Sequence, residues 1–270
     1  MRARKRFGQH FLHDAAVIER ILAAVDLKPG DAAVEIGPGH GELTGGLLRS
    51  AGRLDAIEID RDLAGSLRAR FAAGAALVLH EADALQFDWR ALAAARGAPL
   101  RLVGNLPYNV STPLLFRLLQ AAEVITDMHF MLQKEVVERI VAAPGSDAYG
   151  RLTVMLAPRV ASTWLLDIGP GAFRPAPRVV SSVVRLRVIE PPWRIGPLYG
   201  PVVAAAFSQR RKTLRNALRA YLSAAQIEAL GIDPGVRAER LSPREFALLA
   251  DAAERLQASA LAHPPAAVLH

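Results

Sequence analysis

Short apolar runs alternate with segments of helical periodicity through about the first 190 residues. Residues 32–36 (AAVEI) predict a buried strand that ends in the glycine turn GPGHG. The same pattern then predicts strands at 54–60, 76–83, 100–107 and 128–133, and helices at 42–49, 62–71, 113–120 and 134–142. A β-branched run at 179–188 predicts a late strand that pairs with one near 160–166. This alternation favours an α/β fold in which helices cover both faces of a mostly parallel, doubly wound sheet.

The pattern changes after Glu190. The segment PPWRIGPLYGP is rich in proline and glycine, and from Val202 the apolar spacing is helical to about residue 258. We therefore expect a first domain over residues 1–192, a small α-helical domain over 193–258, and a disordered tail over 259–270.

Composition excludes several classes of protein. With 51% hydrophobic and 22% charged residues, the chain has enough apolar surface to bury a core, which argues against disorder throughout. No apolar run approaches the ~18 residues of a membrane-spanning helix, and the basic start leads into no secretory signal. The absence of cysteine excludes disulfides, thiolate catalysis and zinc fingers, and it fits a reducing cytoplasm. The histidines lack metal-ligand spacing, so we expect no metal.

The formal net charge is +7, and arginine supplies most of the 33 basic residues. Such arginine-rich composition is typical of a GC-rich coding bias, so position carries more information than total charge. Three acid-free clusters contain Arg2, Arg4, Lys5 and Arg6; Arg174, Arg178, Arg185 and Arg187; and Arg210, Arg211, Lys212, Arg215 and Arg219. They predict a polyanion-binding surface, with a solvated surface as the alternative.

The last cluster has a helical pattern. Its basic residues recur at spacings that place several of them on one helix face, and an apolar stripe of Leu214, Ala217, Leu218 and Leu222 accompanies them. We expect a helix that packs by its apolar side and offers cations to phosphates.

The turn VEIGPGHGELT predicts a ligand site. Gly37, Gly39 and Gly41 would let a ligand approach the backbone, but the residue where G-x-G-x-x-G needs its third glycine is Glu42. This spacing disfavours a nicotinamide dinucleotide, and with it an oxidoreductase. Two acids lie at the ends of the next strands: Glu58, suited to a ribose diol, and Asp83, suited to an adenine amino group. Together these features predict a nucleoside-cofactor site, whereas each alone is also typical of a turn or a cap.

The most specific motif is GNLPYN, at the end of the fourth predicted strand. The Asn105 side chain and the carbonyl before Pro107 can both accept from an exocyclic NH2 group, while Tyr108 can stack on the ring. Such a turn also precedes a helix, and we expect Ser111 to cap it.

The segments GPGHGELT, EID, EADAL and NLPY, in this order, resemble the class I S-adenosylmethionine-dependent methyltransferases that act on adenine N6. The segments RKRFGQHFLHD, MHFMLQKEVVERI, YGRLTVM, FRPAPRVVSSVVRL and FSQRRKTLRNAL are similar, more narrowly, to the KsgA-type small-subunit rRNA adenine dimethyltransferases. The resemblance covers Arg4 to about Phe246. It implies S-adenosylmethionine as cofactor and dimethylation of N6 on two adjacent adenosines near the 3′ end of 16S rRNA. The partner would be an immature small subunit, and the enzyme a cytoplasmic monomer.

The resemblance also implies roles for individual residues. The cofactor would be bound by His10, Leu12, Gly37, Gly39, Glu58, Asp83 and Asn105, and the target base by Asn105, Leu106, Pro107 and Tyr108. Phe173 is similar to an aromatic residue that would stack on the base, or it is a core residue. The rRNA would contact Arg4, Lys5, Arg6, Arg174, Arg178, Arg210, Arg211, Lys212 and Arg215. The family commonly has Asn at the position of His10, so a contact through the backbone would survive where a side-chain contact would not.

Two alternatives remain open from the sequence. A large-subunit rRNA methyltransferase of the macrolide-resistance type shares NxPY-like and GQNF-like segments, although the NLPY form and the helical C-terminal segment favour the small-subunit enzyme. A non-catalytic assembly factor would bind the subunit by its basic surface alone. The intact motif from Asn105 to Tyr108 favours catalysis over that interpretation.

Overall fold

The computed structural model describes residues 10–72, 76–107, 110–209 and 211–262. Contacts within the chain divide it into two compact units, of which the first comprises residues 1–138 and 160–188 and the second residues 139–159 and 189–270. The late pair of strands therefore belongs to the first unit, and the segment 139–159 groups with the C-terminal helices. We expected residues 1–192 to form the first domain without interruption. In the structure, residues 139–159 instead group with the second unit.

The first unit is built on one large sheet with strand order β4-β3-β2-β5-β6-β9-β7. Its strands are β2 (Ala32–Ile36), β3 (Leu54–Glu58), β4 (Leu77–Glu81), β5 (Leu100–Asn105), β6 (Ile125–Gln133), β7 (Val160–Ile168) and β9 (Ser181–Val188). The pairs from β4 to β6 are parallel, whereas β9 runs antiparallel to both β6 and β7. The predicted pairing of the two late strands is confirmed, and the sheet has the arrangement of a class I methyltransferase.

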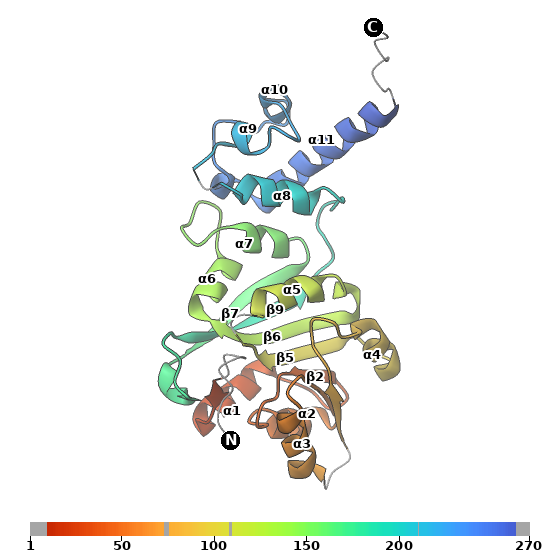
Figure 1. Ribbon diagram of the computed structural model, residues 1–270, viewed down its shortest axis with the longest axis vertical. Coiled ribbons are helices and arrows are strands. Elements are labelled where there is room, and N and C mark those ends of the chain that lie inside the picture. Colours follow the sequence, from red (N-terminus) through yellow and green to blue (C-terminus); the bar gives the residue numbers. More distant parts are fainter. Residues whose placement is uncertain (1–9, 73–75, 108–109, 210, 263–270) are drawn as a thin grey trace. The chain divides into compact units, whose positions relative to one another are not determined.

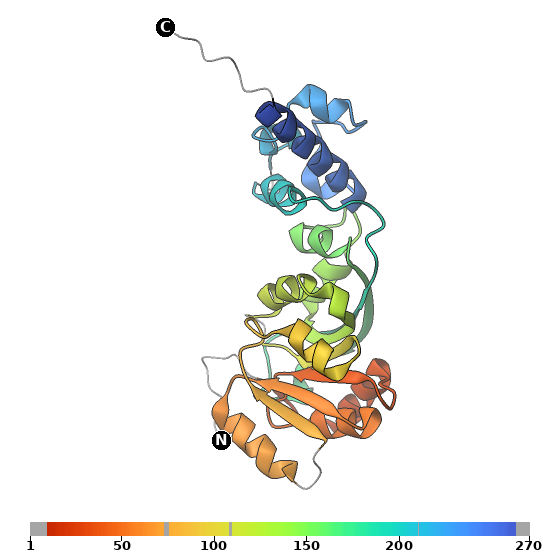
Figure 2. The ribbon, with the colours of Figure 1, turned by 90° about the vertical axis from the view of Figure 1, so that its right-hand side faces the viewer.

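The helices of this unit are α1 (Ala15–Val25), α2 (Thr44–Ala51), α3 (Arg61–Arg70), α4 (Trp89–Arg96), α5 (Ser111–Leu119) and α6 (Lys134–Val141), the last of which reaches into the second unit. Figures 1 and 2 show the strands as one continuous sheet flanked by helices. Every residue of β2 and β3 is buried, as expected for parallel strands covered on both faces. The predicted α/β fold is therefore confirmed.

A short second sheet pairs β1 (Phe11–Leu12) antiparallel with β8 (Phe173–Arg174). Leu12 and Phe173 are both buried in a cluster with Ile21 of α1, Leu47 of α2 and Met131 of β6. The N-terminal segment is thus fixed against the sheet by a pairing between residues more than 160 positions apart in the sequence.

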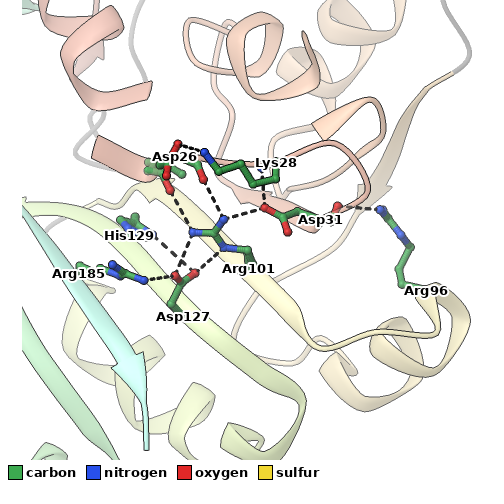
Figure 3. A network of polar contacts seen from close by, with 9 residues as sticks. Asp26, Lys28, Asp31, Arg96, Arg101, Asp127, His129 and Arg185 are labelled. Atoms are coloured by element: carbon green, nitrogen blue, oxygen red, sulfur yellow. Dashed lines mark hydrogen bonds and ion pairs between the residues drawn. The ribbon is translucent and has the colours of Figure 1, made fainter. Parts of the chain in front are cut away.

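Arg101, at the amino-terminal edge of the sheet, holds several segments together (Figure 3). It forms two hydrogen bonds of 3.0 Å with the buried carboxylate of Asp127 on β6 and one of 2.7 Å with Asp31 before β2. It also donates to the carbonyls of Val25 and Asp26 at the end of α1. All five N–H donors of the guanidinium are thereby used. This edge lies opposite the carboxyl ends of the parallel strands, where ligands bind in such folds.

The second unit is α-helical, with α7 (Arg151–Leu156), α8 (Tyr199–Phe207), α9 (Leu214–Ala217), α10 (Ala224–Glu228) and α11 (Pro243–Ala262). Its buried cluster includes Phe246, Tyr149 and Tyr199. The two phenols donate to the carbonyls of Leu241 and Val154, which satisfies their hydroxyls inside the cluster. Helix α11 continues through residue 262, into the segment expected to be a disordered tail, and residues 263–270 lie outside the described ranges.

The predicted basic helix of this unit is wrong in its extent. Only Leu214–Ala217 is helical, because Thr213 forms a β-bridge with Arg237 and the amides of Leu214 and Arg215 donate to the carbonyls of Val236 and Pro234. Arg211 and Lys212 therefore precede the helix. The apolar stripe is nevertheless buried at Leu214, Leu218 and Leu222, since successive turns preserve its spacing. None of the helices in the described ranges has the length and hydrophobicity needed to cross a bilayer.

Candidate active site

A cavity of about 300 Å³ opens at the carboxyl ends of β2, β3 and β5. Its wall includes the glycine turn after β2, Glu58 at the end of β3, Asp83 beyond β4 and Asn105 at the end of β5. The chain order of the strands reverses between β2 and β5, and such a reversal leaves a crevice at the carboxyl edge of the sheet. The cofactor residues predicted from separate motifs are therefore brought together at one place.

The glycine turn is tied to Glu58. The amide of Gly39 donates to Glu58 Oε2 at 3.2 Å, and the amide of Asp60 donates to Oε1 at 2.9 Å. Burial raises the pKa of the Glu58 carboxyl, and these two amide donors oppose that rise. Gly37 has a φ of +66°, and a Cβ placed on it would meet no atom within 4 Å. The turn therefore leaves open space beside its backbone for a ligand, with an acidic acceptor next to it.

The segment His10–Leu12 forms one side of the cavity. The Phe11 ring packs on the turn so closely that a Cβ at Gly39, which has a φ of +62°, would lie 3.1 Å from it, and it also contacts the His40 ring. Nδ1 of His10 lies 2.7 Å from the carbonyl oxygen of Pro175, which can only accept, so Nδ1 carries the proton. The His10 ring is thus turned to β8, and its backbone carbonyl faces Asn105.

Asn105 is oriented by that carbonyl. Its Nδ2 donates to the oxygen of His10 at 3.0 Å, which assigns the amide nitrogen to the N-terminal segment. Oδ1 is the remaining polar atom of the amide; none of the described residues donates to it, and Asn105 lines the cavity. Leu106 and Pro107 continue the wall of the cavity, and Leu106 is held by a hydrogen bond from its amide to Met131. Tyr108 lies outside the described residues.

Two details of the prediction are wrong. Strand β4 ends at Glu81, so Asp83 follows the strand by two residues, where its Oδ1 accepts from the amide of Leu85 at 2.9 Å. Ser111 does not cap helix α5: the N-cap is Val110, whose carbonyl accepts from the amide of Leu114, and Ser111 is the buried first residue of the helix. Neither change removes Asp83 from the wall of the cavity.

Phe173 is only 3% exposed and packs in the cluster of Leu12 and Ile21, and it is not part of the cavity wall. The geometry therefore describes it as a core residue. Arg174 and Arg178 are exposed in the first unit, and Arg211, Lys212 and Arg215 are exposed in the second. Arg4, Lys5, Arg6 and Arg210 lie outside the described residues.

The residues of the cavity wall that sequence reasoning missed include Phe11 and two acids, Glu35 and Glu42. Glu35 could have been found, because an acid in the middle of the otherwise apolar run AAVEI is unusual for a buried strand. It is 2% exposed and accepts from Thr44 Oγ1 at 2.6 Å, and burial raises its pKa to about 8.

Comparison with known proteins agrees with this geometry. The family model described as "Ribosomal RNA adenine dimethylase" matches residues 1–255. The chain is 54% identical to the ribosomal RNA small subunit methyltransferase A of Pseudomonas fluorescens over 93% of each chain. It is also 54% identical to the protein of that name from Methylococcus capsulatus, over 90% of this chain and 95% of the other.

Two solved structures share the fold along most of the chain. A dimethyladenosine transferase from Plasmodium falciparum superposes with a TM-score of 0.76 at 24% identity, covering 89% of this chain and 96% of its own. The 23S rRNA methyltransferase ErmE superposes with a TM-score of 0.70 at 26% identity, covering 90% and 99%. With the matched family model spanning nearly the whole chain, this protein belongs to the ribosomal RNA adenine dimethylase family.

Proposed function

We propose that this protein dimethylates N6 of two adjacent adenosines near the 3′ end of small-subunit rRNA, with S-adenosylmethionine as the methyl donor. The observation that carries this proposal is that Asn105, whose amide nitrogen donates to the His10 carbonyl and whose oxygen remains as an acceptor, lines the same cavity as the proposed cofactor residues. The family match and the relatives named small subunit methyltransferases support the choice of rRNA. We further propose that it acts in the cytoplasm as a monomer on an immature particle.

The residues of the cavity fit the cofactor. Glu58 would accept from the ribose hydroxyls, Asp83 from the adenine amino group, and the turn at Gly37 and Gly39 would hold the methionine part. His10 and Leu12 complete the cavity on the other side. The bound cofactor supplies a methyl group carried on a positively charged sulfonium.

Asn105 activates the target amine. The lone pair of adenine N6 is delocalised into the ring, so the amine is a poor nucleophile. Oδ1 of Asn105 and the carbonyl of Leu106 would accept from its N–H groups, which favours a tetrahedral nitrogen and localises the pair for in-line attack. Pro107 has no N–H to compete for these acceptors. The ammonium formed is acidic and loses its proton to solvent, so this site needs no side-chain base.

The target adenosine must leave any stack to reach this site, as bases do in other enzymes of nucleobase chemistry. We propose that Tyr108 stacks on the flipped base, since it follows the acceptor residues directly in the sequence. A second methyl transfer requires that the same acceptors take the remaining N–H of N6-methyladenosine. Leu106, whose side chain is buried, contributes to the shape of this pocket.

The alternative substrate is large-subunit rRNA. The similarity of this chain to the 23S enzyme is 26% identity, against 54% to proteins named small subunit methyltransferases. A purely structural assembly factor would have no use for an acceptor oxygen held at a nucleoside cavity. Small-subunit dimethylation is therefore the function that the residues support best.

Mapping the methylated positions tests this proposal. Small subunits that lack the modification, incubated with the protein and labelled cofactor, are expected to gain label on two neighbouring adenosines near the 3′ end of their rRNA. Large subunits treated in the same way serve as the control. Label on the large subunit alone would show that large-subunit rRNA is the substrate. Absence of transfer to either subunit would favour a non-catalytic assembly factor.

We also propose that the exposed basic residues of the second unit bind rRNA phosphates. Changing Arg211 and Arg215 to Gln is expected to weaken small-subunit binding and to flatten the slope of log affinity against log salt by about 0.7–0.9 for each phosphate ion pair removed. The matched control changes Arg244 and Arg255 to Gln, because these side chains are exposed in the same unit outside the cluster. Equal salt slopes for the two double variants would show that Arg211 and Arg215 do not bind rRNA phosphates.

A further inference from the structure

The cavity is strongly acidic for a site that must hold the carboxylate of an amino acid. Among the described residues that line it, four are acids and none is Lys or Arg. The acids are Glu35, Glu42, Glu58 and Asp83, and His10 is the remaining titratable residue of the wall. Glu58 and Asp83 have roles in the proposed function, whereas Glu35 and Glu42 have none.

Glu42 lies beside the glycine turn. Its Oε2 is 3.9 Å from the position that a Cβ on Gly39 would occupy. Burial raises the pKa of this carboxyl, while the amides of His40 and of Glu42 itself and the charges of His40 and Arg70 oppose the rise. Arg70 is engaged with the carbonyl of His40 at 2.5 Å, outside the cavity wall.

Glu35 lies deeper, on β2. Thr44 of α2 is the only group among the described residues that donates to it, and only to Oε2. The negative charges of Glu42 and Glu58 raise the pKa of Glu35 beyond the effect of burial. The charge of Asp60 raises the pKa of Glu58 in the same way. Each of these acids therefore lacks a cationic partner within the cavity wall.

We propose that Glu42, together with Glu35, makes the cavity selective for the positively charged cofactor over the product that remains after methyl transfer. This inference rests on the proposed function, because it concerns the proposed cofactor. In the transfer, the bond between sulfur and the methyl carbon breaks with its electron pair left on sulfur, and a new bond forms between that carbon and N6. The sulfonium charge is lost, and the proton released from nitrogen goes to solvent. The attraction of the acidic wall is thus removed at the moment when the product must leave.

Calorimetric titration of S-adenosylmethionine and of S-adenosylhomocysteine tests the proposal by binding alone. In the wild type, the charged ligand is expected to bind more tightly than the neutral one. In Glu42→Gln, the ratio of the two affinities is expected to fall about three- to tenfold, mainly through weaker binding of the charged ligand. A thermal melt of each variant establishes that it is folded.

Glu19→Gln is the matched control, because Glu19 is exposed on α1 and does not line the cavity. The same change of net charge should leave the affinity ratio as it is in the wild type. An unchanged ratio in folded Glu42→Gln, or an equal loss of affinity for both ligands, would overturn the proposal. Failure of the wild type to bind either ligand would instead contradict the proposed cofactor.

Proton release from the wild type gives a second test that needs no variant. Glu35, whose pKa is raised to about 8, is largely protonated at pH 7 before a ligand binds. A cation placed near it favours release of this proton, so Glu35 adds its charge to that of Glu42 only when the charged ligand is bound. Titrations in buffers of different ionisation enthalpy should therefore show more protons released with the charged ligand than with the neutral one. Glu35→Gln is expected to remove the difference. Equal release by both ligands from the wild type would count against selection by charge.

Discussion

Replacing Asn105 by alanine is expected to lower the rate of methyl transfer about 10²–10³-fold, the usual effect of removing one hydrogen bond made in a transition state. The loss should appear in the single-turnover rate rather than in cofactor affinity. In the proposed mechanism Oδ1 accepts from the reacting amine, whereas Glu58 and the glycine turn, which are hydrogen-bonded to each other, would hold the cofactor independently of it. Rapid-quench measurement of transfer at saturating cofactor gives the rate, and calorimetry gives the affinity.

The control for this experiment must separate the acceptor oxygen from the contact that Asn105 makes with the N-terminal segment. His10→Asn serves this purpose, because it removes the ring contact with Pro175 but keeps the backbone carbonyl that accepts from Asn105. This variant is expected to transfer methyl groups at nearly the wild-type rate. If His10→Asn were as slow as Asn105→Ala, the slower transfer would result from loosening of the N-terminal segment and not from loss of the acceptor oxygen. A wild-type rate in folded Asn105→Ala would show that Asn105 has no part in catalysis.

The parts of the site that the sequence predicts well are those set by local pattern. The buried strand at 32–36 is confirmed residue for residue, because a run of apolar side chains bounded by a glycine turn has few other solutions. Glu58 closes β3 as expected. The convergence of this residue with Asn105 follows once the strands are taken as parallel, since carboxyl ends of parallel strands meet at one edge.

The parts that it does not predict depend on pairings between distant segments. The contact of Phe11 with Gly39 requires the β1–β8 pair, which no periodicity in a two-residue strand can reveal. The start of helix α9 at Leu214, after the basic residues Arg211 and Lys212, is set by hydrogen bonds from Leu214 and Arg215 to residues 234–236. The apolar stripe at 214, 218 and 222 correctly predicts which residues are buried, but the continuous helix that it predicts is not formed. Tertiary hydrogen bonds here override a weak local preference for helix.

Arg101 illustrates the same limit, and it leads to the largest expected effect on stability. Its partners come from α1, from the segment before β2 and from β6, so the strand order must be known before the pairing can be seen (Figure 3). Changing Arg101 to Met is expected to lower the free energy of unfolding of the first unit by about 3–5 kcal/mol, because it leaves the Asp127 carboxylate, 1% exposed, without its main partner.

Arg185 provides the matched control for Arg101. It also bonds to Asp127, at 3.2 Å, but its own side chain is 43% exposed and makes one such contact. Arg185→Met is therefore expected to lower the free energy of unfolding by only about 0–1 kcal/mol.

Hydrogen exchange of peptides from β5 and β6 measures the stability of the first unit by itself, whichever order the two units unfold in. Adding Asp127→Leu to Arg101→Met should restore part of the stability, since the double variant no longer buries an unpaired charge. Equal effects of Arg101→Met and Arg185→Met would show that the five hydrogen bonds of Arg101 stabilise the sheet no more than the single contact of Arg185 with Asp127 does.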